Sequence, residues 1–192
     1  MPEPIARAAV EVAHAQRQLV YSHPSNIEGT RIALRAGVDV LAHPPDTTEG
    51  VDASLIRTIV DRGMAMTPTL KMFADTASSE PAYLNLIYEF VRQFHRMGGP
   101  LLFGTDVGYL GDYAIEDELR ALAGAGLGPR DVLRMLTAAP ALRFGVEAET
   151  GSVSVGRAAD LVLLEADPIT DVLALTKVAA TIRGGRVLYR RP

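Results

Sequence analysis

Several features that are common in proteins are missing from this chain. The 192 residues contain no cysteine, which excludes disulfide frameworks and thiolate metal sites and is typical of a reducing compartment. No apolar stretch approaches the roughly 20 residues that span a bilayer. Residues 1–18 lack a basic segment followed by an apolar core, so we expect no secretory signal. These absences predict a cytoplasmic protein without a membrane partner.

Positive charge is also scarce. The net charge is −4, and no basic stripe or run is present, so nucleic acid is not an expected partner. Apolar residues make up 48% of the chain and charged residues 22%, which is the composition of a globular protein. The length suffices for one domain with a small appendage.

Three short apolar runs each precede a residue of a metal-binding type. They are Leu19–Ser22 before His23, Val38–Ala42 before His43, and Leu101–Thr105 before Asp106. Each run predicts a strand, and helix-like stretches between them predict a βαβα pattern with a parallel sheet. The carboxyl ends of parallel strands converge on one rim, where such folds place their chemistry. Two imidazoles and a carboxylate at this rim predict a divalent-metal site.

Cap and turn residues divide the rest of the chain. Ser25-Asn26-Ile27-Glu28 predicts a capping box that opens a helix ending at Gly37, and Asp52 predicts the N-cap of a helix over 51–62. The other predicted elements are helices over 2–18, 82–97, 115–123 and 129–138, a strand over 64–67, a strand over 160–164, and a hairpin of 179–182 and 187–189 around Gly184-Gly185. Lys71, Met72 and Tyr109 follow strand ends; they are candidates for a pocket lining or ordinary exposed loop residues.

The size of the βα portion limits the architecture. A closed (β/α)8 barrel needs about 250 residues, whereas this portion holds four predicted strands. We therefore expect half of a barrel over residues 1–148 and a β appendage over 149–192. Half a barrel leaves two strand edges open, which proteins normally cover or pair. The chain would close against another copy, join a missing half, or fold into an open sheet.

Several stretches, in order along the chain, resemble the C-terminal half of the amidohydrolase superfamily, especially its imidazolonepropionase-like and prolidase-like metal-dependent hydrolases. The matching stretches are Val20–His23, Gly37–His43, Thr67-Pro68-Thr69-Leu70, Phe103-Gly104-Thr105-Asp106 and Thr150–Leu164. The last is similar to the segment by which these enzymes return from the barrel to a β-sandwich. The resemblance implies an α/β fold with barrel strands five to eight of a TIM-type barrel and part of a C-terminal β-sandwich.

The resemblance also implies roles by position. His23 matches the metal-binding histidine after strand five, His43 the one after strand six, and Asp106 the aspartate after strand eight, which also handles the proton of the attacking water. The implied cofactor is a divalent metal, with zinc as the first choice and one or two ions in an intact site. Family members carry a further His-x-His pair after the first strand, and nothing in this sequence matches it.

Two functions therefore remain open. The first is hydrolysis of a C–N bond in an amide or cyclic amide by metal-activated water, with a small molecule as substrate. In that case the chain is a part lacking the first-strand ligands, and it would work as a homo-oligomer or with a missing N-terminal half. The alternative is an inactive truncated scaffold, or an interaction module that needs a partner chain.

Overall fold

The computed structural model describes residues 1–48, 50–77 and 80–192 and divides into two compact units, Met1–Tyr113 and Ala114–Pro192. Each unit combines helices with a three-stranded sheet, so the predicted α/β class is confirmed. No helix within these ranges has both the length and the apolar character that crossing a bilayer requires. The division at residue 148 into barrel and sandwich segments stays a prediction.

The sheet of the first unit is parallel and has the order β1-β2-β3. Its strands are β1 (Tyr21–Ser22), β2 (Val40–Ala42) and β3 (Ala65–Thr67). The predicted strand over residues 101–105 joins this sheet only at a parallel bridge between Leu101 and Met66. Around this bridge, Met66 N–H donates to Pro100 and Leu102 N–H donates to Met66, both at 2.9 Å, which places the segment beside β3.

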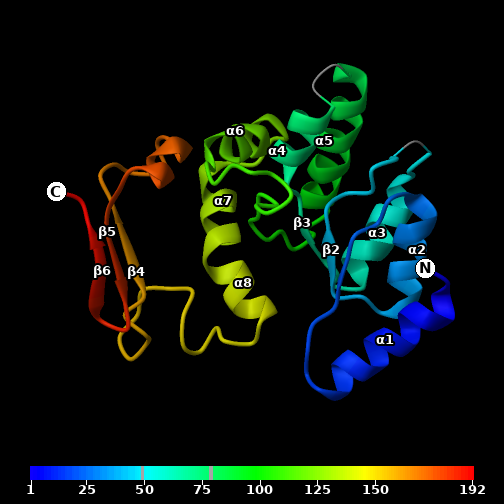
Figure 1. Ribbon diagram of the computed structural model, residues 1–192, viewed down its shortest axis with the longest axis horizontal. Coiled ribbons are helices and arrows are strands. Elements are labelled where there is room, and N and C mark those ends of the chain that lie inside the picture. Colours follow the sequence, from blue (N-terminus) through cyan, green and yellow to red (C-terminus); the bar gives the residue numbers. More distant parts are fainter. Residues whose placement is uncertain (49, 78–79) are drawn as a thin grey trace. The chain divides into compact units, whose positions relative to one another are not determined.

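Helices alternate with these strands (Figure 1). They are α1 (Glu3–Ala15), α2 (Ile27–Ala36), α3 (Ala53–Asp61), α4 (Leu70–Thr76) and α5 (Pro81–Arg96). Helix α1 packs on α2, and both α3 and α4 pack on α5. The predicted cap at Asp52 is confirmed, because its carboxylate accepts a hydrogen bond of 2.8 Å from Leu55 N–H. Gly37 ends α2 in the left-handed region, at φ 87°, as predicted.

Two local features differ from the sequence prediction. The N-cap of α2 is Asn26, not Ser25, because the extended backbone of Asn26 lets its side chain accept a hydrogen bond of 2.8 Å from Gly29 N–H. Helix α4 was not predicted. It is a helix of 7 residues that begins two residues after Pro68, with its first four residues buried, and it is too short to show an amphipathic period.

The core of the first unit lies around the two inner strands. Val40, Leu41, Ala65 and Met66 are all fully buried, which agrees with their continuous apolar runs and with a parallel sheet covered on both faces. The helices contribute further fully buried side chains, among them Ile56, Ile59, Leu70, Phe94 and Ile87. The strand ends that carry the candidate site are therefore anchored in packed structure.

The second unit holds helices and an antiparallel sheet. The helices are α6 (Glu116–Gly124), α7 (Pro129–Leu136), α8 (Ala138–Arg143) and the 3₁₀-helix η1 (Val172–Thr176); the strands are β4 (Leu161–Leu164), β5 (Val178–Arg183) and β6 (Arg186–Arg190). The order is β4-β5-β6. Gly184 and Gly185 form the predicted hairpin turn with φ values of 54° and 77°, which only glycine adopts readily.

Candidate functional site

The candidate site lies at the carboxyl ends of the parallel strands in the first unit. His23 follows β1 directly, and His43 follows β2 directly. Because the two strands pair in parallel, with Tyr21 opposite Val40, both histidines leave the sheet at the same edge. The backbone N–H of His43 also donates to the carbonyl of Thr67 at 2.9 Å, which ties this position to the end of β3.

The structure brings the two histidines together. Their ring centroids lie 5.1 Å apart, with the planes inclined at 76°. The rings differ in environment: His43 is only 6% exposed, whereas the side chain of His23 is 55% exposed and its Nε2 lies 3.8 Å from Oδ2 of Asp46. The pair thus presents one buried and one solvent-facing imidazole.

Asp106 acts on the same site through its charge. Burial has the largest influence on the pKa of His43 and lowers it below its ordinary value. The charge of Asp106 opposes burial and raises this pKa. Smaller effects come from His23, which lowers the pKa, and Asp46, which raises it. A lowered pKa keeps the His43 imidazole neutral at physiological pH. A neutral ring next to a carboxylate is able both to bind a cation and to exchange a proton.

The backbone is strained at three strand-end positions. His43 has a φ of 85°, Thr69 a φ of 45° and Asp106 a φ of 57°, all in the left-handed region that non-glycine residues rarely adopt. Such conformations cluster at functional sites, where the surrounding fold holds them. Threonine is the least expected of the three, because it is β-branched.

Sequence reasoning did not single out Thr69, Phe73 or Asp46. The hydroxyl of Thr69 lies 2.5 Å from Nδ1 of His43, and the Phe73 ring meets the His43 ring edge-on at 6.2 Å between centroids. The signal that could have found Thr69 is its position two residues beyond the end of β3, close to where the histidines follow their own strands. Phe73 lies on the unpredicted helix α4 and gave no signal.

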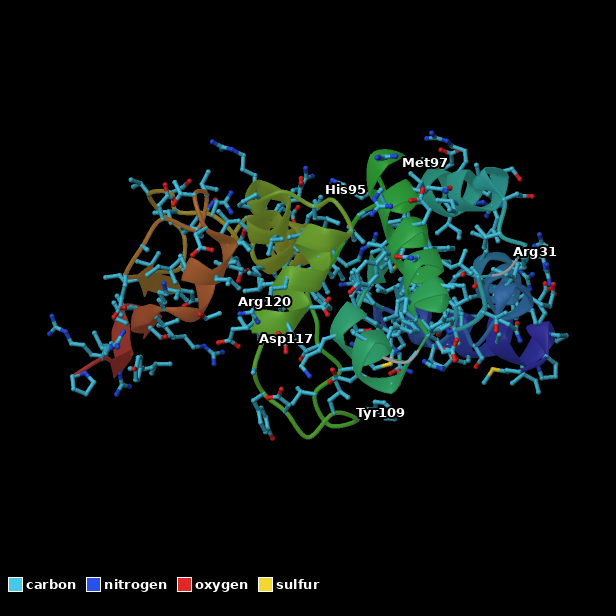
Figure 2. All side chains as sticks on the ribbon, turned by 90° about the horizontal axis from the view of Figure 1, so that it is seen from above. Arg31, His95, Met97, Tyr109, Asp117 and Arg120 are labelled. Atoms are coloured by element: carbon cyan, nitrogen blue, oxygen red, sulfur yellow. The ribbon has the colours of Figure 1, made fainter. Side chains whose placement is uncertain are left out.

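The proposed pocket residues divide into two groups. Lys71 and Met72 are buried on α4, and the ammonium group of Lys71 pairs with Asp75 and, at 3.4 Å, with Asp112. The hydrogen bond that Lys71 donates to the Asp75 carboxylate is the main cause of its raised pKa. Tyr109 is 69% exposed, on the loop that follows Asp106 (Figure 2). Lys71 therefore joins α4 to this loop.

The predicted ligand set is only partly assembled. Within the described ranges, no three histidine, aspartate or glutamate side chains converge in a geometry that could hold a metal ion. His23 and His43 are adjacent, and Asp106 is close enough to influence His43. The assignment of these three residues as ligands stays a prediction.

Comparison with known sequences identifies the family. The model of the amidohydrolase family matches residues 2–188, and the chain belongs to this family. Among related sequences, an uncharacterised protein of Mycobacterium tuberculosis is 27% identical over 143 residues, which cover 67% of this chain and 38% of that protein.

Solved structures resemble the whole of this chain. The structure of a Xaa-Pro dipeptidase with bound methionine matches with a TM-score of 0.86 at 23% identity, covering 100% of this chain and 49% of that one. A putative prolidase from Bifidobacterium longum matches with a TM-score of 0.81 at 31% identity, covering 99% of this chain and 51% of that one. The resemblance to prolidase-like amidohydrolases is thereby confirmed, and the chain spans about half the length of these two structures.

Proposed function

From this family membership, we propose that the chain forms part of a metal-dependent hydrolase that cleaves C–N bonds in amides or cyclic amides. The observation that carries the proposal is the pairing of His23 and His43, whose ring centroids lie 5.1 Å apart at the ends of adjacent parallel strands. The two residues are separated by a complete helix in the sequence, so the fold rather than local sequence brings them together. Barrel enzymes carry their active sites at this edge of the sheet.

The donor groups suit a divalent ion. His43 is buried and neutral, which is the form of imidazole that binds metals, and Asp106 supplies an anionic oxygen nearby. We assign His23, His43 and Asp106 as the residues that would hold the ion, with zinc as the first choice and one or two ions in a complete site. When bound, such an ion polarises a carbonyl group and makes water nucleophilic at neutral pH.

Asp106 is proposed to handle the proton in this reaction. Its carboxylate would accept a proton from the attacking water and return it to the leaving amine, which is the work of a general base and acid. Asp106 is half-buried, so solvent can reach it, and its strained backbone fixes the direction in which its side chain leaves the chain. The charge of Asp106 raises the pKa of His43, so the two groups interact.

The complete site is proposed to need groups from beyond these residues. The described residues supply no cluster of three ligands, and the chain spans about half of its structural relatives. We propose that residues 1–148 form barrel strands five to eight, that residues 149–192 form part of a β-sandwich, and that a further segment or a second copy closes the barrel. The isolated chain should accordingly hydrolyse substrates poorly.

The names of the structural neighbours suggest the first substrates to try. One is a Xaa-Pro dipeptidase and one a putative prolidase, so dipeptides ending in proline are suitable probes for this chain. We expect little turnover from the purified 192-residue chain. Rapid hydrolysis that is abolished by Asp106→Asn would contradict the proposed need for additional groups, although it would support the role of Asp106.

Metal content tests the proposal directly. The purified chain is incubated with zinc, dialysed and analysed by mass spectrometry for bound metal. We expect about one equivalent, lost in His43→Ala and in the solvent-facing variant His23→Ala. His95→Ala is the matched control, because His95 lies in the last turn of α5 and not at the strand ends (Figure 2).

Two outcomes separate the candidate functions. Zinc that disappears from both strand-end variants but not from His95→Ala supports the hydrolase. A folded chain without bound metal supports the alternative, an inactive scaffold or interaction module that needs a partner chain. The absence of a three-residue cluster among the described residues is the observation that keeps this alternative in the test. Circular dichroism of each variant confirms that lost metal does not reflect lost fold.

A further inference from the structure

The last residue of β3 and the turn after it each contact His43, although the proposed function gives them no role. The carbonyl of Thr67 accepts a hydrogen bond of 2.9 Å from His43 N–H. The hydroxyl of Thr69 lies 2.5 Å from Nδ1 of the His43 ring. The first contact fixes the backbone of His43, and the second fixes the rotation of its imidazole. Both come from a stretch of three residues.

Thr69 is itself held firmly in place. It is 2% exposed, and its backbone has a φ of 45°, which a β-branched residue adopts only under constraint. Fully buried Leu70 follows it at the start of α4. On the other side lies Gly104, where an added Cβ would come within 2.6 Å of Thr67 Cγ2 and 3.9 Å of Thr69 Cγ2. The turn is confined between His43 and the segment that leads to Asp106.

This arrangement determines which nitrogen of His43 can serve as a ligand. Nδ1 faces Thr69, so Nε2, on the opposite side of the ring, faces away from the turn. A neutral imidazole carries its hydrogen on one nitrogen only, and the nitrogen without hydrogen is the ligand. If Thr69 accepts from Nδ1–H, the lone pair of Nε2 is available. If Thr69 donates to Nδ1, Nε2 carries the hydrogen and cannot bind a metal.

We propose that Thr69 is a positioning residue that accepts a hydrogen bond from Nδ1–H of His43 and so keeps Nε2 free to bind a divalent metal. Histidines that bind metals generally donate their second ring N–H to a fixed acceptor in this way. The metal-binding part of this inference rests on the proposed function. The tautomer is a property of the chain alone and can be measured without metal.

Nitrogen NMR of the ring tests the tautomer. The chain is labelled with ¹⁵N-histidine and studied without metal at a pH of about 8, above the unperturbed histidine pKa of about 6.5. The variant His43→Gln identifies the signals of His43. We expect the hydrogen on Nδ1 in the wild type and in Thr69→Ser, which keeps the hydroxyl. In Thr69→Val, which removes the hydroxyl but keeps the branched shape, we expect a shift toward the Nε2–H form.

A matched control and a second measurement complete the design. Thr58→Val removes a hydroxyl on α3 that donates to the backbone carbonyl of Ser54 in the same helix, so it should leave the His43 spectrum unchanged. Zinc affinity should fall about 10–100-fold in Thr69→Val and stay near wild type in Thr69→Ser. Calorimetric titration of zinc into each variant measures this difference.

The outcomes distinguish the two proposals. Hydrogen on Nε2 in the wild type, or an unchanged tautomer in Thr69→Val, overturns the role of Thr69. If Thr69→Val does not fold, the wild-type and Thr69→Ser spectra test the role of Thr69. Both must show the hydrogen on Nδ1 of His43, and its absence in either overturns the role. A wild-type chain that binds no zinc overturns the proposed function, whereas the tautomer spectra still decide whether Thr69 orients His43.

Discussion

Gly104 offers a direct test of how closely the strand ends are packed. It lies in the segment between the Leu101 bridge and Asp106, and its backbone is not in the left-handed region. A Cβ at this position would lie 2.6 Å from Cγ2 of Thr67. That is about 1 Å closer than the optimal carbon–carbon separation of roughly 3.5–4.0 Å. Gly104→Ala therefore forces two segments apart at the edge of the candidate site.

The expected cost follows from two opposing contributions. Overpacking a filled site typically destabilises a protein by about 1–3 kcal/mol. Replacing glycine by alanine also reduces the conformational entropy of the unfolded chain, which stabilises the folded state by about 0.4–1 kcal/mol. We expect Gly104→Ala to lower the free energy of unfolding by about 1–2 kcal/mol, because the clashing Thr67 methyl is attached next to the backbone and has little room to retreat.

Urea denaturation followed by circular dichroism measures this change. The matched control is Gly111→Ala, where the added Cβ meets nothing within 4 Å and the backbone needs no left-handed conformation. We expect its stability to equal or slightly exceed that of the wild type. Thr67→Ser removes the clashing methyl, so the double variant with Gly104→Ala should recover most of the loss. A coupling energy of about 1 kcal/mol is expected for such a contact.

The reasoning fails under either of two results. Wild-type stability in Gly104→Ala would mean that the segment before Asp106 is not packed closely against Thr67. A loss of stability that Thr67→Ser does not reduce would mean that the strain arises elsewhere than at this methyl group.

Three further predictions concern the first unit. Asn26→Ala removes the hydrogen bond to Gly29 N–H and should lower the free energy of unfolding by about 1 kcal/mol in urea titrations, because a cap is lost; an unchanged midpoint would contradict the cap. Ile59→Ala creates a cavity at a fully buried position and should cost about 2–5 kcal/mol in the same assay, whereas exposed Ile5→Ala should stay within about 0.5 kcal/mol of wild type. Burial lowers the pKa of His43 in the folded state, so the unfolded chain binds the proton first as the pH falls. The free energy of unfolding should therefore decline below a pH of about 6.5. It should level off once His43 is also protonated in the folded chain. Urea midpoints measured across that range should decline less in His43→Gln, and equal slopes would refute the assignment.

Local signals in the sequence predicted the elements well where one residue determines the local geometry. Asp52 and Gly37 cap their helices as expected, and Gly184-Gly185 turns the hairpin, because capping and left-handed turns depend on the residue at that position. The capping box at Ser25 was wrong by one residue. Serine and asparagine are nearly equal caps, so the backbone conformation at Asn26 decides between them, and the sequence does not reveal that conformation.

Features that depend on distant contacts were harder to predict. The predicted strand over 101–105 has the right composition, yet the ladder is limited to residues around Leu101 and Met66. The strand-end rule correctly brought His23 and His43 to one edge. It did not identify Thr69 as a contact of His43, because a threonine after a strand is usually only a turn residue.

The three strained residues link the stability of the fold to the chemistry proposed for it. His43, Thr69 and Asp106 each hold a left-handed backbone, which costs of order 1–3 kcal/mol per residue. The positions beside them include fully buried Leu41, Met66 and Leu70, and burial of such side chains contributes roughly 1.5–3 kcal/mol each. The packed strands thus help to offset this cost. Two of the three proposed ligands, His43 and Asp106, and the proposed positioning residue Thr69 hold these strained conformations, so packing of the fold rather than a bound ion would set the backbone at these positions.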